Sequence, residues 1–191
     1  MGKQLALAEQ IKIAGELAYR CDVFHTTWFA IASRESRDKY KEALNEHAEI
    51  LVMCQAAHLF ALVCALHSLF ERREDTVNLP ALSSKINDVA ADELKRCEIV
   101  AGKVGKLRHN LFAHRSGKLT TEKAYALAGI TSNDLRWLSA RAAAIVRMFA
   151  RELDLPAPLE AIGAKVAVTK LLDAIARDTN ATWAGTADPI A

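Results

Sequence analysis

The sequence is poor in the residues that interrupt helices. Its 191 residues include only 8 glycines and 4 prolines, and both types are unfavourable inside helices. Alanine, leucine, glutamate, lysine and arginine are abundant instead, and all of them form helices readily. Hydrophobic residues make up 51% of the chain, which is enough for a core. We therefore expect a nearly all-helical protein of one domain, or of one domain with a tail.

The sequence also lacks a strong net charge and any paired cysteine motif. A formal charge of +2 does not by itself indicate nucleic-acid binding. The four cysteines (Cys21, Cys54, Cys64 and Cys97) form no CxxC pair and fall inside helical patterns, as buried thiols of a reducing compartment do. The first residues lack the long apolar stretch of a signal peptide. We therefore expect a cytoplasmic protein.

One stretch, residues 50–70, is long and apolar enough to resemble a membrane span. It contains Gln55, His58 and His67, however, and it continues a helix that begins among charged residues. We interpret it as the central helix of a bundle, buried on most of its sides. A membrane-associated helical protein is the more remote alternative.

Hydrophobic periodicity predicts five main helices. Apolar residues recur every three or four positions, a spacing that places them on one helix face. The predicted main helices cover residues 4–35, 41–72, 91–114, 133–153 and 159–177. Asn78 and Pro80 begin a shorter helix that includes residues 81–89, and another short helix ends at Gly129. Ser132 is expected to cap the fourth main helix.

These helices predict an all-α fold. The first two are long and closely joined, so they should pack as an antiparallel pair. We expect residues 1–178 to form an antiparallel bundle of four to five main helices. Residues 179–191 show no hydrophobic period and are expected to form a disordered C-terminal tail.

The candidate functional stretch is residues 106–117, at the end of the third main helix. Leu107 belongs to a buried stripe, and at about 100° per residue His114 falls almost directly above it. Arg108 and Arg115 are seven residues apart and therefore share one flank of the helix. Because a helix C-terminus carries negative partial charge, an anion here must be held by these arginines themselves.

Arg108 and His114 combine two groups that RNA cleavage needs. An imidazole can take up a proton near neutral pH and so activate a ribose 2′-hydroxyl. A guanidinium binds phosphate oxygens in pairs, stays charged and can stabilise the charge that develops on them. The alternative for His114 is a histidine that only completes the core stripe. The neighbouring arginines favour the catalytic interpretation.

Two neighbours of Arg108 carry weaker signals. His109 points away from the Leu107 stripe, so a solvated surface position explains it equally well. Asn110 lies some 60° from the stripe and could orient a catalytic group. Both are supporting candidates.

Metal and phosphate-loop motifs do not fit the sequence. His109 and His114 are five residues apart, whereas two ligands on one helix usually need a spacing of three or four. The glycines within residues 101–106 lack the strand–loop–helix context and the GK[ST] ending of a phosphate loop. Helix packing or local flexibility explains these glycines better. We expect neither a metal nor a cofactor.

The motif RHNLFAH at residues 108–114 resembles the signature of the HEPN superfamily. That signature is an arginine, usually followed by a polar residue, and a histidine after four to six intervening positions. Here five residues intervene, and His109 is the polar follower. The longer form LRHNLFAHR and the upstream LFERREDTVNL at residues 69–79 are similar to the abortive-infection, AbiU-like branch. The resemblance covers residues 12–153.

This resemblance implies a dimeric helical bundle in which two such motifs face each other. It implies a metal-independent RNA endonuclease of a phage-defence or toxin–antitoxin system, with Arg108 and His114 as the catalytic pair. The partners it implies are RNA, a second copy of the chain and an antitoxin of the nucleotidyltransferase type, without a membrane. We expect supporting roles for His109, Asn110 and Arg115, and substrate binding by Lys103, Lys106 and Lys118.

The spacing of the catalytic pair also favours a dimer. On a regular α-helix Arg108 and His114 are about 120° apart around the axis and roughly 9 Å apart along it. One protomer cannot easily bring both to a single phosphate, whereas two copies related by a two-fold axis can. The alternative function is that of a non-catalytic bundle that binds a protein partner or a nucleotide.

Overall fold

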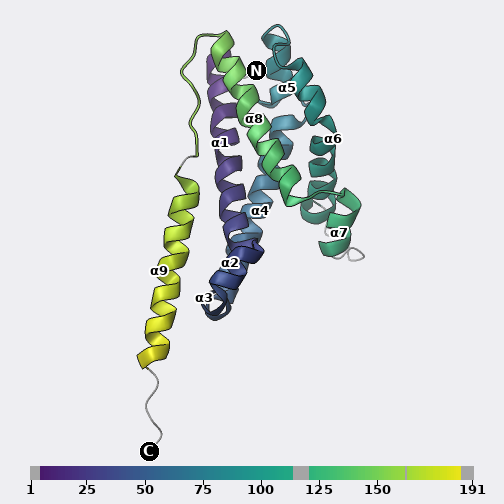
Figure 1. Ribbon diagram of the computed structural model, residues 1–191. Helices are drawn as coiled ribbons and strands as arrows, with labels where there is room; N and C mark the ends of the chain where they lie inside the picture. Colours follow the sequence, from purple (N-terminus) through teal and green to yellow (C-terminus); the bar gives the residue numbers. More distant parts are fainter. Residues whose placement is uncertain (1–4, 114–120, 162, 186–191) are drawn as a thin grey trace, which may run out of the picture. The chain divides into compact units, whose positions relative to one another are not determined.

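The computed structural model describes residues 5–113, 121–161 and 163–185, and every regular element within these ranges is a helix (Figure 1). The predicted all-α class is therefore confirmed. The chain divides into two compact units: Met1–His25 with Phe60–Ala161, and Thr26–Leu59 with Ile162–Ala191. The number of helices in one bundle, the domain boundaries and the dimer stay predictions.

Two long helices contribute residues to both units, and the first unit contains most of the remaining elements. The long helices are α1 (Leu7–Ala32) and α4 (Ala48–Phe70). The first unit adds α5 (Leu79–Lys85), α6 (Ala91–Leu107), the π-helix η1 (Arg108–Ala113), α7 (Thr121–Ala128) and α8 (Ser132–Glu152). Within this unit α6 packs against α7 and α8, and α5 packs against both α6 and α8.

The core of the first unit lies between the apolar faces of these helices. Its fully buried side chains include Leu66 of α4, Val104 and Leu107 of α6, and Ile145 and Phe149 of α8. Burial of each such side chain contributes about 1.5–3 kcal/mol relative to exposure. The stripes predicted from helical spacing therefore hold α6 in place.

Local sequence signals set several helix ends. Asn78 caps α5 by accepting a hydrogen bond from the backbone N–H of Ala81 at 2.8 Å, with Pro80 in the first turn as predicted. The helix ends at Lys85, earlier than the predicted residue 89. The physical reason is that Asn87 and Asp88 have φ values of 50° and 53°, in the left-handed region.

The caps of α7 and α8 lie close together in the sequence. Gly129 follows α7 with φ of 59°, a left-handed cap that glycine adopts without strain and that confirms the predicted end. The prediction that Ser132 caps α8 is wrong by one residue. Thr131 is the cap, because its extended backbone lets its hydroxyl accept from the N–H of Asp134, whose carboxylate accepts from the N–H of Thr131.

The second unit contains the end of α1, the start of α4, and the helices α2 (Arg34–Lys39), α3 (Lys41–Glu46) and α9 (Ala164–Gly185). The single helix predicted at 41–72 is interrupted at His47, whose backbone leaves the helical region with φ of −104° and ψ of 24°. α3 packs against α9, and Nε2 of His47 lies 3.5 Å from the hydroxyl of Thr179. The break therefore accompanies a tertiary contact.

The helix α9 begins later and ends later than the predicted 159–177. Tyr40 is buried and donates a hydrogen bond from its hydroxyl to the carboxylate of Asp173 at 2.7 Å. Thr179 is also buried, so the helix continues past the point where its own hydrophobic period stops. Packing against α3 supports these residues where local propensity does not.

The helix α4 is the one helix in the described part of the chain that is long and apolar enough to cross a membrane. Only 28% of the most apolar 18-residue stretch of this helix is buried, so the prediction that the helix is buried on most sides is wrong. Leu62 and Leu66 are fully buried, whereas Ile50, Val52 and Met53 are about 60% exposed. A helix that is apolar all round needs cover on every side, and its first half does not have it.

Candidate active site

The helix that carries the candidate site changes its geometry where the motif begins. α6 buries Cys97, Val104 and Leu107 and is followed directly by the π-helix η1, which covers Arg108–Ala113. The predicted helical extent of this region is thus confirmed up to Ala113. π-helical segments are rare and are frequently found at functional sites.

The π-helix overturns the angular argument for a dimer. That argument assumed regular α-helical geometry between Arg108 and His114. A π-helix bonds residue i to residue i+5 and therefore takes more residues per turn, so an angle of about 120° does not apply. His114, Arg115 and Lys118 lie outside the described residues, and their predicted roles stay predictions.

Arg108 is half-buried at the junction of α6 and η1, and its charge acts on a histidine of α4. Burial lowers the pKa of His67, and the positive charge of Arg108 lowers it further. The carboxylate of Glu71 opposes both effects. The guanidinium and the His67 imidazole are therefore electrostatic neighbours.

His67 and Glu71 are residues of this neighbourhood that the sequence analysis did not assign to the site. Nδ1 of His67 lies 3.6 Å from Oε2 of Glu71, and both side chains are largely buried. Two signals could have pointed to the site: the i,i+4 spacing of His67 and Glu71, and the position of Gly105 three residues before Arg108.

The other predicted residues of α6 and η1 have different surroundings. His109 and Lys106 are exposed, and Asn110 is half-buried. Lys103, a predicted substrate-binding residue, forms an ion pair at 3.3 Å with Asp134 of α8. This pair joins α6 to the first turn of α8, so the ammonium also has a structural partner.

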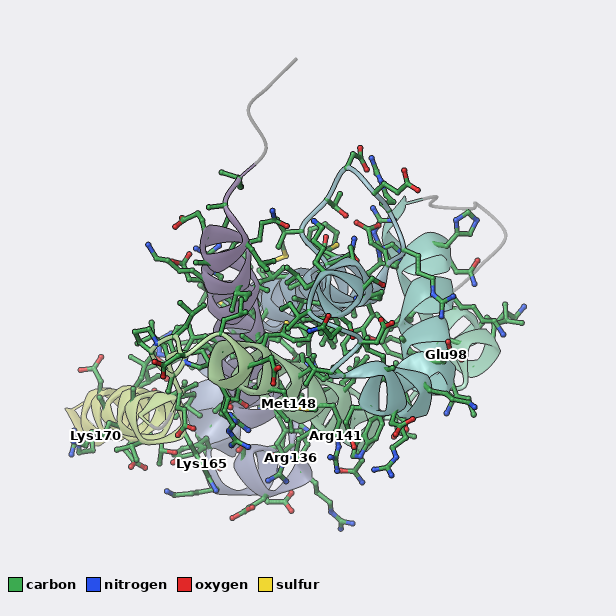
Figure 2. All side chains as sticks on the ribbon, turned by 90° about the horizontal axis from the view of Figure 1, so that it is seen from above. Glu98, Arg136, Arg141, Met148, Lys165 and Lys170 are labelled. Atoms are coloured by element: carbon green, nitrogen blue, oxygen red, sulfur yellow. The ribbon has the colours of Figure 1, made fainter. Side chains whose placement is uncertain are left out.

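The helix α8 carries Arg136 and Arg141, of which Arg141 is joined to the first turn of α6. Figure 2 shows Arg136 and Arg141 extending outward from this helix. Arg141 lies over the ring of Trp137, with 5.5 Å between its guanidinium carbon and the ring centroid, and it pairs with Glu93 of α6 at 3.3 Å. Its charge is therefore partly compensated by a partner on α6.

A groove of about 550 Å³ lies within the first unit, between the connection that follows α4 and the helices α5 and α6. Its charged lining includes Arg72, Arg73 and Lys95. Arg72 pairs with Glu98 of α6, and Arg73 forms two hydrogen bonds with Asp75. The groove therefore carries both signs of charge.

The buried thiols lie in surroundings that keep them protonated. The four cysteines are free, and burial raises the pKa of Cys21 to about 12 and that of Cys97 to about 11. Such thiols stay protonated and unreactive at neutral pH. Within the ranges that the structure describes, no group of three His, Cys, Asp or Glu side chains could hold a metal.

Comparison with known families assigns the region around the motif. The family model HEPN_AbiU2, described as AbiU2, matches residues 6–155. No curated protein and no solved structure matches the chain. The match includes the motif region, α6, η1 and α8, and agrees with the resemblance seen in the sequence. The chain therefore belongs to the AbiU2 family of HEPN proteins.

Proposed function

We propose that this protein is a metal-independent RNA endonuclease of a phage-defence or toxin–antitoxin system. The observation that carries the proposal is the position of Arg108: the first residue of the HEPN motif is also the first residue of a π-helix, next to the His67 imidazole. Family membership supports a helical domain of a type often found in ribonucleases.

In the proposed reaction His114 acts as the general base. Its imidazole takes the proton of a ribose 2′-hydroxyl, the 2′-oxygen attacks the neighbouring phosphorus, and the bond from phosphorus to the 5′-oxygen breaks. Arg108 stabilises the negative charge that develops on the non-bridging oxygens. The leaving 5′-oxygen takes up a proton, and the products carry 2′,3′-cyclic phosphate and 5′-hydroxyl ends.

We propose a homodimer in which Arg108 of one protomer and His114 of the other act on one phosphate. Exposed apolar side chains such as Ile50 and Met53 of α4 are suitable for contact with another chain. A cytoplasmic location and an antitoxin of the nucleotidyltransferase type complete the proposal. His109, Asn110 and Arg115 would support the pair, and Lys103, Lys106 and Lys118 would contact the RNA backbone.

Cleavage of RNA in the presence of a chelator tests the proposal. The comparison is between wild type, Arg108→Ala and His114→Ala, with Lys165→Ala, an exposed residue on α9, as a matched surface control. We expect wild type and control to produce cyclic phosphate ends and both site variants to lose at least about a hundredfold in rate. Equal activity in all four proteins would refute the proposal.

A second candidate function is that of a non-catalytic module that binds a protein partner or a nucleotide. The exposed Ile50 and Met53, three residues apart on one side of α4, favour a protein partner, since exposed apolar surface marks interaction sites. This function predicts no cleavage at any protein concentration. Growth arrest on expression that His114→Ala relieves would decide for the enzyme.

A further inference from the structure

We propose that His67 and Glu71 form a positioning pair for Arg108, in which the neutral His67 imidazole supports the guanidinium and protonation of His67 releases it. The proposal rests on the proposed ribonuclease function, because the position of Arg108 matters for activity only if Arg108 acts on the RNA. His67 is a positioning residue here and makes no contact with the substrate.

The geometry begins where the ring of His67, on α4, meets α6 at Gly105. A Cβ atom built on Gly105 would lie 3.7 Å from Cδ2 and 4.0 Å from Nε2 of His67. The Cδ2–Nε2 edge of the ring therefore faces α6 at Gly105, while Nδ1 faces the carboxylate of Glu71 at 3.6 Å. Arg108 follows Gly105 by three residues, which places it on the same side of the helix one turn later.

This orientation gives the two ring nitrogens different roles. The Glu71 carboxylate can only accept hydrogen bonds, so it favours the tautomer with the proton on Nδ1. Nε2 then keeps its lone pair on the side of α6. A neutral imidazole in this state can accept a hydrogen bond from an N–H of Arg108, and an acceptor of this kind restricts the long arginine side chain.

Protonation reverses the interaction. An imidazolium has no acceptor, and it places a second positive charge beside the guanidinium. Among the described residues, the charged groups that act on His67 are Glu71 of α4 and Arg108 of η1, and α6 approaches the Cδ2–Nε2 edge of the ring at Gly105. Burial and Arg108 lower the pKa of His67, so the neutral state prevails at physiological pH.

The first experiment measures the pair without any substrate. The pKa of His67 is determined by NMR titration of its ring in the full-length wild type, in Arg108→Gln and in Glu71→Gln. We expect the pKa to rise in Arg108→Gln and to fall in Glu71→Gln, since each substitution removes one of the two charges. Lys165→Ala, changed at an exposed residue of α9, is the control and should leave the pKa of His67 unchanged. An unchanged His67 pKa in Arg108→Gln would overturn the proposal.

The second experiment measures positioning during cleavage. The readout is the ratio of cleavage rates with Arg108 and with Arg108→Lys, because a lysine keeps the charge but lacks the planar fork. We expect a ratio on the order of tenfold at pH 8 that falls several-fold by pH 5. In a His67→Asn background, which keeps a neutral acceptor at every pH, the ratio should not change with pH. Protonation of His114 affects both rates of each ratio and cancels.

The two experiments separate the two proposals. If wild type does not cleave RNA, the proposed function fails, and the NMR titration alone decides whether the pair exists. If wild type cleaves RNA and the ratio has the same pH dependence in both backgrounds, the positioning role fails while the ribonuclease stands. Both proposals are supported if the His67 pKa changes in Arg108→Gln and the ratio of cleavage rates does not depend on pH in the His67→Asn background.

Discussion

Asn78 donates a hydrogen bond from Nδ2 to the backbone oxygen of Arg73 at 2.6 Å and thereby closes the connection between α4 and α5. The same side chain accepts from the backbone N–H of Ala81 at 2.8 Å and caps α5. Asn78 is fully buried, so its amide group depends on these partners within the protein.

Asn78→Ala should therefore destabilise the protein by about 2–3 kcal/mol, since it removes a helix cap and the hydrogen bond from Nδ2 to the backbone oxygen of Arg73. Chemical denaturation measures the free energy of unfolding. Ser84→Ala, in the same short helix but exposed, should change it by less than about 0.5 kcal/mol. A loss below 1 kcal/mol for Asn78→Ala would contradict the role of this side chain.

Leu107 precedes Arg108 and is fully buried, so it anchors the end of α6. Leu107→Ala should lower the free energy of unfolding by about 2–5 kcal/mol, because it removes apolar contacts and leaves a cavity. Ile99→Ala on the same helix is the control, since Ile99 is 76% exposed. Denaturation of both variants should separate them clearly, and similar losses would contradict the burial of Leu107.

His25 should make stability depend on pH near neutrality. Burial lowers its pKa, and Arg136 lowers it further, against opposing effects of the Ser132 backbone and Asp22. The unfolded chain therefore binds a proton at a higher pH than the folded protein does. The free energy of unfolding should fall as the pH drops through about 6.5 and should keep falling until the folded-state pKa is reached.

The check is denaturation of wild type and His25→Gln at a series of pH values from 8 to 5. The variant should have a shallower slope, with a residual part from His67, whose pKa is also lowered. Measurements at pH 8, where histidine is neutral in folded and unfolded chains, give the cost of the substitution itself. Identical slopes for the two proteins would show that His25 is not responsible.

Protonation of Asp173 should also destabilise the folded protein at low pH. Here a negative charge is lost, whereas at His25 a positive charge is gained. Hydrogen bonds from Tyr40 and Lys39 lower its pKa. The contribution of this contact is present above the unfolded-state pKa of about 4 and is lost as the pH falls through the lower folded-state value. In thermal unfolding at pH 5 to 2.5, Asp173→Asn should lose less stability than wild type, and a parallel decline would contradict this.

Mixing two inactive variants tests whether the proposed site is shared between protomers. Arg108→Ala and His114→Ala dimers should each be inactive, but a mixed dimer keeps one intact site of two. Random exchange makes half of the dimers mixed, so we expect about a quarter of the wild-type cleavage rate. Mixing Arg108→Ala with the double variant should restore nothing. If the first mixture also stays inactive, the shared site is wrong.

The spacing of apolar residues correctly predicted which face of a helix is buried, and capping residues predicted where a helix begins. The stripe that ends at Leu107 predicted the buried face of α6, and Asn78 with Pro80 predicted the start of α5. Local chemistry determines these features. A capping side chain forms its hydrogen bond within one helical turn, and an apolar stripe can be buried by any apolar neighbour. The interruption at His47 and the extension of α9 past residue 177 depend on contacts between residues more than 100 positions apart.

By itself the sequence determined the all-α class, several helix ends and the family, since periodicity, caps and a motif are all local patterns. Only the tertiary structure decided that the helix becomes a π-helix at Arg108 and that His67 and Glu71 lie beside it. The reason is that the neighbours of a charge depend on how α4 approaches α6, and a local sequence pattern does not specify which residues of two separate helices meet.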